Sequence, residues 1–80
     1  MLKINFSKSA QKILKSLSPK HKHQCALKIQ ELILKPLPND VKSIKGTSFL
    51  RVSVGEYRIV YQYTKENLEV LLLDKRNNDL

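Results

Sequence analysis

The sequence contains one cysteine, two histidines, no tryptophan and no long apolar run. A single thiol, Cys25, cannot form an intramolecular disulfide, and it leaves no second thiol for a cysteine-based zinc site. His21 and His23 are spaced i, i+2, so a helix would direct them to different faces, which disfavours a shared metal. No stretch approaches the roughly 18 apolar residues of a membrane-spanning helix, and the N-terminal residues lack the apolar segment of a signal peptide. We therefore expect a soluble, cytoplasmic protein of a reducing compartment, without a metal, cofactor or membrane partner.

Acidic residues are also scarce, and none precedes Glu31. The chain has 15 lysines and arginines against 7 aspartates and glutamates, so its formal net charge is +8 and its pI is about 9.8. A surface of one sign favours a nucleic acid, an anionic membrane or an acidic protein as partner, and charge alone does not choose among them. We interpret residues 1–80 as one small domain with little room for an enclosed pocket. Function is therefore expected on a surface or at an interface.

Strict alternation across residues 50–63, interrupted by Gly55 and Glu56, predicts a β-hairpin. Glycine at the first central position of a two-residue loop suits a type II′ turn, which pairs Val54 with Tyr57. One face is then apolar and is assigned to the core, because a one-residue slip would expose all of it. The core face carries Leu50, Val52, Val54, Tyr57, Ile59, Tyr61 and Tyr63. The other face carries Arg51, Ser53, Arg58 and Gln62.

The polar face of this hairpin brings two arginines together. In the predicted register Ser53 faces Arg58 and Arg51 faces Val60, so the two guanidinium groups are diagonal neighbours, roughly 7 to 8 Å apart at the backbone. One interpretation is a solvated sheet face whose arginines have no specific role. The other is a phosphate-binding surface, because the rigid fork of arginine matches phosphate and no acidic residue of the hairpin lies on this face. On the second interpretation, an external polyanion would neutralise the pair.

Two helices are predicted between residues 7 and 36. Ser7 can cap the first helix, whose apolar residues follow i, i+3, i+4, i+7 spacing. Ser18 followed by Pro19 is typical of the start of a second helix. Leu27 and Leu34 lie nearly opposite the main apolar face of this second helix, where a helix on a sheet should be polar. They are either simple surface leucines or a second contact, with the first helix or with a protein partner.

The remaining segments predict strands and one loop. Residues 2–6 alternate, which indicates a short strand. Residues 40–47 are expected to form a loop in which Gly46 makes the turn. Residues 68–73 are apolar on both faces, with Leu68, Val70 and Leu72 on one side, as in a central or doubly covered strand. The expected fold class is α+β: a short N-terminal strand, two helices and a three-stranded antiparallel meander, with the helices on one face of the sheet.

Five short motifs follow one another along the second half of the chain: Lys45 with Gly46, Arg51, the run from Val54 to Tyr61, the stretch from Leu71 to Asp74, and Lys75 with Arg76. Their identity and order resemble the signature of the RelE/ParE superfamily of bacterial toxins. The resemblance implies a single RelE-like domain that acts as the toxin of a type II toxin–antitoxin system. It also implies a cognate antitoxin encoded alongside, which we expect to be acidic and RelB-like.

The resemblance implies different activities in the two branches of the superfamily. In the RelE branch, which we favour, the toxin is an endoribonuclease that cleaves messenger RNA on the ribosome and so inhibits translation. In the ParE branch, the toxin inhibits DNA gyrase and is not a nuclease. A third possibility is a basic module that has lost catalysis and only binds its antitoxin.

The resemblance also nominates site residues. Arginines can hold a phosphate in line and stabilise growing negative charge, but they are poor at proton transfer because they stay protonated at neutral pH. Positions that match basic residues contacting or activating RNA, together with the adjacent Lys75, form the expected catalytic set Lys45, Arg51, Arg58, Lys75 and Arg76. The expected RNA- and phosphate-binding set is Lys42, Lys45, Arg51, Ser53 and Arg58. Arg58 matches best and is assigned to charge stabilisation, and Leu27 and Leu34 are assigned to antitoxin binding.

Two features depart from the RelE pattern. Ser53 stands where many relatives carry a second basic residue, and no tyrosine or histidine follows Arg76, where active RelE-type toxins commonly have one. The core-facing tyrosines are excluded, so the candidate acid/base groups are Lys45, Lys75 and Asp79. We therefore expect catalysis to be weak, to depend strongly on the ribosome, or to be lost.

Overall fold

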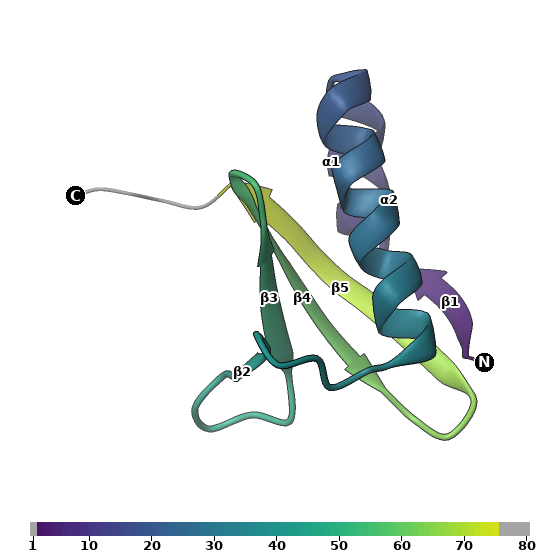
Figure 1. Ribbon diagram of the computed structural model, residues 1–80, viewed down its shortest axis with the longest axis vertical. Coiled ribbons are helices and arrows are strands. Elements are labelled where there is room, and N and C mark those ends of the chain that lie inside the picture. The colour runs from purple at the N-terminus through teal and green to yellow at the C-terminus, as the bar shows by residue number, and fades with distance from the viewer. Residues whose placement is uncertain (1, 76–80) are drawn as a thin grey trace.

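The computed structural model describes residues 2–75, which form a five-stranded mixed sheet with two helices on one face (Figure 1). In chain order the elements are β1 (Lys3–Phe6), α1 (Lys8–Ser16), α2 (Pro19–Leu34), β2 (Lys42–Ser43), β3 (Leu50–Val54), β4 (Tyr57–Tyr63) and β5 (Asn67–Lys75). The strand order is β1-β5-β4-β3-β2, with β1 parallel to β5 and the other pairs antiparallel. The predicted α+β fold, with its antiparallel meander of β3, β4 and β5, is confirmed.

Both helices begin at a serine cap, as predicted. The Ser7 hydroxyl accepts a hydrogen bond from the Ala10 N–H at 3.0 Å, and the Ser18 hydroxyl accepts one from the His21 N–H at 3.4 Å. Each cap satisfies a backbone donor that the first helical turn leaves free, and Pro19 at the start of α2 sacrifices no helical hydrogen bond. The short connection between the helices brings α1 and α2 together over the sheet (Figure 1).

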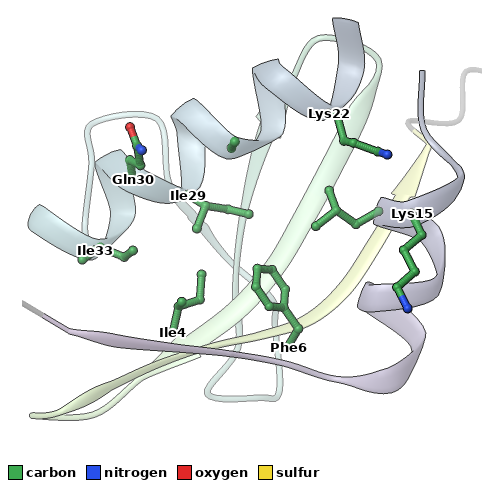
Figure 2. Close-up of a pocket in the computed structure, with 9 residues that line it drawn as sticks. Ile4, Phe6, Lys15, Lys22, Ile29, Gln30 and Ile33 are labelled. Carbon is green, nitrogen blue, oxygen red and sulfur yellow. The ribbon is translucent and has the colours of Figure 1, made fainter. Parts of the chain in front are cut away.

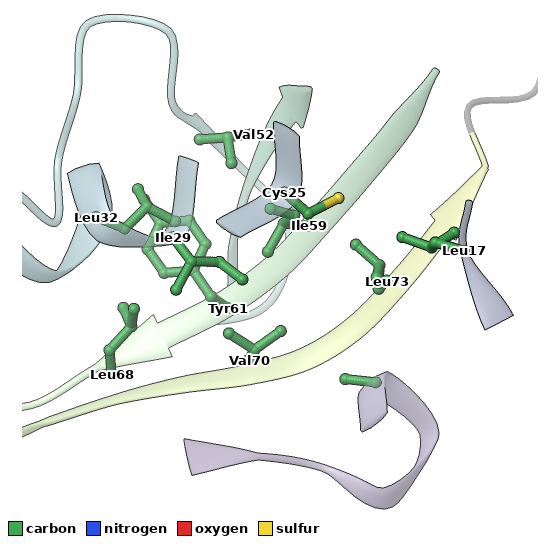
Figure 3. Packing of buried hydrophobic residues seen from close by; sticks show 11 residues of the cluster. Leu17, Cys25, Ile29, Leu32, Val52, Ile59, Tyr61, Leu68, Val70 and Leu73 are labelled. Carbon is green, nitrogen blue, oxygen red and sulfur yellow. The ribbon is translucent and has the colours of Figure 1, made fainter. Parts of the chain in front are cut away.

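The core lies between the helices and the sheet, and its buried residues come from both layers (Figure 3). Cys25 and Leu32 on α2 meet Ile59 and Tyr61 on β4 in this layer. Burial raises the pKa of the Cys25 thiol, which keeps it in the unreactive protonated form. The full buried set is Ala10, Leu17, Cys25, Ile29, Leu32, Val52, Ile59, Tyr61, Leu68, Val70 and Leu73.

The hairpin of β3 and β4 has the predicted register, with Val54 opposite Tyr57, Ser53 opposite Arg58 and Arg51 opposite Val60. Gly55, the first central residue of the turn, has a φ of 58°, whereas the second, Glu56, has a negative φ. This is the combination that a type II′ turn requires. Tyr63 lies on the predicted core face, opposite the buried Leu68, but it is 37% exposed because it is the last residue of β4.

Strand β5 occupies the interior of the sheet, as predicted, but its alternation is broken. Val60 pairs with Leu72 while the next residue, Tyr61, pairs with Val70, so Leu71 is an extra residue in a β-bulge. The Ser7 hydroxyl donates a hydrogen bond to the Leu71 carbonyl at 2.7 Å. The residue that caps α1 therefore also satisfies the carbonyl of the bulge residue.

The bulge reverses the faces of the second half of β5. Strict alternation placed Leu72 with Leu68 and Val70, yet Leu72 is 38% exposed and Leu73 is buried. That prediction was wrong because it assumed an uninterrupted ladder, in which every second residue shares a face. The residue after Leu73, Asp74, consequently points to the sheet face away from the helices, opposite Arg58.

The segment predicted as a loop over residues 40–47 contains the short strand β2. Lys42 pairs with Arg51 and Ser43 with Leu50, so β2 adds an edge strand to β3. Gly46 has a φ of 81° and makes the turn that follows, as predicted. No helix in the described part of the chain is long and apolar enough to cross a bilayer. Residues 2–75 also contain no group of three or more metal-binding side chains that could hold an ion.

Candidate functional site

An open depression of about 430 Å³ lies on the sheet face opposite the helices, and we call it the outer depression. It is lined by Ser43, Ile44, Lys45, Arg51, Arg58, Val60, Leu72 and Asp74. Three of these residues, Lys45, Arg51 and Arg58, belong to the set predicted from the sequence to bind phosphate. The fold therefore brings together, in one place, cations from the loop after β2 and from strands β3 and β4.

The strand register explains how the two arginines reach this surface. Arg51 and Arg58 lie on the outer face of neighbouring antiparallel strands, where the pairing of Val54 with Tyr57 places them diagonally. Lys45 comes from the turn between β2 and β3. That turn is closed by the Ile44 N–H, which donates to the Phe49 carbonyl at 3.0 Å.

An acidic residue stands inside this cationic surface. The Arg58 Nη2 atom lies 3.4 Å from the Asp74 Oδ2 atom, and the two side chains are 33% and 40% exposed. The other carboxylate oxygen of Asp74, Oδ1, is buried and accepts no hydrogen bond. The hairpin carries no acidic residue on this face, but β5 supplies a carboxylate, so Arg58 has an internal partner as well as the predicted external polyanion.

The other predicted site residues are not gathered in the outer depression. Lys42 and Ser53 are exposed on β2 and β3 without lining it. Lys75 is exposed at the end of β5, and its Nζ atom lies 3.7 Å from the Glu56 carboxylate at the hairpin turn. Arg76 and Asp79 lie outside the described residues. Of the candidate acid/base groups, Lys45 is thus the one that the described structure places among the arginines.

Sequence reasoning missed Asp74 as a site residue. Asp74 belongs to a motif recognised in the sequence, but strict alternation would have turned it to the same side as Leu68 and Val70, which is buried. Its position depends on the bulge at Leu71, for which the sequence carries no clear signal. Leu72 reaches the outer depression for the same reason.

The tyrosines of β4 do not contribute to the outer depression. Tyr61 is fully buried, and burial, with a smaller contribution from the charge of Asp40, raises its pKa to about 12. The ring of Tyr57 packs against His21 of α2 with 5.1 Å between ring centroids, and this histidine is partly buried. Tyr57 and Tyr61 therefore both lie on the face of the sheet that the helices cover.

A second hollow, an apolar groove of about 410 Å³, lies between α1, α2 and β1 on the opposite side of the molecule (Figure 2). Ile4, Phe6, Ile29 and Ile33 point into it. It is lined by Ile4, Phe6, Leu14, Lys15, Lys22, Ala26, Ile29, Gln30 and Ile33. Leu27 and Leu34 are not among these residues; they lie on α2 and are 52% and 72% exposed.

Comparison with known proteins gives one family and several solved structures. A family model described as the ParE toxin of type II toxin–antitoxin system, parDE, matches residues 4–80. The isolated E. coli RelE toxin is 20% identical, with 99% of this chain and 88% of that chain covered and a TM-score of 0.86. The RelE–RelB complex from Pyrococcus horikoshii is 24% identical over 98% of each chain, with a TM-score of 0.82. YafQ from E. coli is 17% identical, with 94% of this chain and 93% of that chain covered and a TM-score of 0.75. Comparison with curated proteins found no similar sequence.

Proposed function

Because this chain belongs to the ParE toxin family of type II toxin–antitoxin systems, we propose that it is a toxin that inhibits translation by cleaving messenger RNA on the ribosome. One observation carries the choice of RNA cleavage. Lys45, Arg51 and Arg58 line a single open depression on the face of the sheet that the helices leave free. Arginine and lysine in this arrangement provide the contacts that a phosphodiester needs.

Cleavage by attack of the 2′-hydroxyl group requires the phosphate to be held in line while negative charge grows on its oxygens. Arg51 and Arg58 would hold the phosphate from neighbouring strands, with Arg58 stabilising the developing charge. Lys45, the candidate group for proton transfer, lines the same depression. The outer depression is open rather than enclosed, so it suits a single RNA strand that a larger particle presents. That geometry favours dependence on the ribosome.

We also propose that an acidic, RelB-like antitoxin restrains the toxin. Several of the similar solved structures, among them those from Pyrococcus horikoshii and E. coli, are complexes of RelE with RelB. The net charge of +8 favours an acidic partner segment, which would fold as it binds. Leu27 and Leu34 on α2 are both more than half exposed and offer apolar surface to a partner. They are the proposed antitoxin contacts.

Inhibition of DNA gyrase is the alternative function, and the description of the matching family as ParE toxins favours it. Ser53, in place of a second basic residue, departs from the RelE pattern. A toxin of this type would use the basic surface for protein contacts and would not cut RNA. The third candidate is a module without catalysis that only binds its antitoxin.

One pair of reactions separates these functions. The purified protein is added to a translation reaction with end-labelled messenger RNA, and separately to a DNA gyrase supercoiling reaction. Cleavage of ribosome-bound RNA with unchanged supercoiling is the expected result. Intact RNA with impaired supercoiling would establish the gyrase-directed function, and no effect in either reaction would leave the non-catalytic module.

A further inference from the structure

The outer depression contains one carboxylate, whose negative charge opposes the proposed binding of an RNA phosphate. Asp74 is the one acidic residue among those that line it, and it lies beside Arg58, with 3.4 Å between Oδ2 and Nη2. Within residues 2–75, neither Lys45 nor Arg51 has a carboxylate oxygen within 4.0 Å. The carboxylate of Asp74 therefore pairs with only one of the three cations, Arg58, which is the arginine expected to stabilise the charge of the phosphate.

The contact between Arg58 and Asp74 has the properties of an exchangeable one. Charge-assisted hydrogen bonds between a guanidinium and a carboxylate are commonly about 2.7 to 2.9 Å long and often bidentate. This contact is longer and involves one oxygen, and both side chains are partly exposed. Ion pairs of this kind contribute little to stability. A phosphodiester that offers two oxygens to the guanidinium fork can therefore replace the carboxylate.

The position of Asp74 is nevertheless fixed by the fold. The β-bulge at Leu71 shifts the register so that Asp74, rather than Leu73, stands opposite Arg58. Hydrogen bonds from Ser7 to the Val70 and Leu71 carbonyls hold the strand at this point. Oδ1 of Asp74 is buried and accepts no hydrogen bond, so the contact of Oδ2 with Arg58 is the polar contact of this carboxylate within residues 2–75.

From these observations we infer that Asp74 is an internal substitute for phosphate: it binds Arg58 in the free protein and must be displaced when RNA enters the outer depression. Asp74 thereby lowers the affinity of this surface for RNA. The inference rests on the proposed function, since it assumes that Arg58 contacts RNA. On this inference, Asp74 of β5 sets the affinity of a site whose other charged residues are cations.

The test uses the full chain and a short single-stranded RNA, with affinity measured at low and at near-physiological salt. Asp74→Asn keeps the shape of the side chain and removes its charge. Glu56→Gln is the matched control, because it removes one carboxylate that also pairs with a cation, Lys75, but lies outside the outer depression. We expect Asp74→Asn to tighten RNA binding about two- to fivefold more than Glu56→Gln. The excess should shrink as salt rises.

Arg58→Ala, alone and combined with Asp74→Asn, completes a double-mutant cycle. Without Arg58, the gain from Asp74→Asn should fall to that of Glu56→Gln. If Arg58→Ala weakens RNA binding but Asp74→Asn gains no more than the control, the inference about Asp74 is overturned and the proposed site stands. If Arg58→Ala leaves RNA binding unchanged, the proposed site itself is wrong. Thermal unfolding of each variant checks the fold. If Asp74→Asn does not fold, Asp74→Ala takes its place in the cycle.

Discussion

The hydroxyl group of Tyr61 donates a hydrogen bond to the backbone carbonyl of Pro36, with 2.6 Å between the two oxygen atoms. Tyr61 is fully buried on β4, and Pro36 follows the end of α2. The elevated pKa of Tyr61, about 12, means that the phenol keeps its proton and remains a donor at all physiological pH values. This contact ties the chain after α2 to the centre of the sheet.

Tyr61→Phe should therefore destabilise the protein. The substitution removes one hydrogen bond and leaves a partly buried carbonyl without its partner, so the free energy of unfolding should fall by about 1 to 2 kcal/mol. Urea unfolding followed by circular dichroism measures the change. Tyr63→Phe is the matched control, because Tyr63 is 37% exposed and its loss of a hydroxyl should change the free energy little. Equal effects of the two substitutions would contradict the structural role given to the Tyr61 hydroxyl.

The ion pair between Lys28 and Asp40 predicts a pH dependence. Lys28 Nζ lies 2.8 Å from Asp40 Oδ2 and donates a hydrogen bond to it, which lowers the pKa of Asp40. Because the folded-state pKa is depressed, the stabilisation is present above the ordinary aspartate pKa of about 3.9 and is lost as pH falls through the folded-state value. Asp40 is about half exposed, so the contribution should stay below about 1 kcal/mol.

Asp40→Asn tests this dependence. At neutral pH the variant should unfold at a lower urea concentration than the wild type, and the difference should disappear in strongly acidic buffer, where the wild-type carboxyl is protonated. The pKa of Lys28 changes in the complementary direction: burial lowers it, but Asp40 and Glu31 together raise it. A difference that persists unchanged at acidic pH would show that Asp40 stabilises the fold by means other than its charge.

Arg58→Ala should abolish RNA cleavage and the growth arrest that it causes, while the fold persists. Loss of one preorganised charge contact costs on the order of 3 to 4 kcal/mol of transition-state stabilisation. The fold should survive because Arg58 projects from the outer face and its ion pair with Asp74 is partly exposed. Cleavage is measured in the translation reaction, and circular dichroism monitors the fold.

Lys12→Ala is the control for Arg58→Ala, since it removes one positive charge from the exposed face of α1, distant in the fold from the outer depression. It should leave cleavage nearly unchanged. An Arg58→Ala variant that remains fully toxic at matched expression would refute the role of Arg58. A variant that unfolds would show instead that Arg58 is structural.

Leu27 and Leu34 should matter for antitoxin binding. Expression of the native operon should yield a complex of this chain with an acidic partner, and association should slow as salt rises because opposite charges steer the encounter. Leu27→Ser should weaken that complex by removing an apolar contact. Leu37→Ser is the matched control, because Leu37 is also 52% exposed but lies on the loop after α2. Recovery of the free basic monomer alone would count against the partner, and equal weakening by both substitutions would count against the α2 contact.

Local sequence features were sufficient for most of the fold. The serine caps at Ser7 and Ser18, the turn glycine Gly55 and the alternation on either side of it all act over a few residues, so their outcome could be predicted. The same alternation places Arg51 and Arg58 on one face, so these two residues of the outer depression can be predicted from the sequence. The role of Arg58 in chemistry stays a prediction.

Contacts between distant residues decided the rest. The edge strand β2 forms only because β3 offers it a partner, since Lys42 and Ser43 carry no strand pattern of their own. The β-bulge at Leu71 coincides with a hydrogen bond from Ser7, 64 residues away in sequence, and this bulge places Asp74 beside Arg58. A period-two pattern cannot reveal such an insertion, because the extra residue is defined by the pairing of two strands. The sequence by itself thus determined which cations share the outer face, whereas only the tertiary structure decided that a carboxylate stands among them.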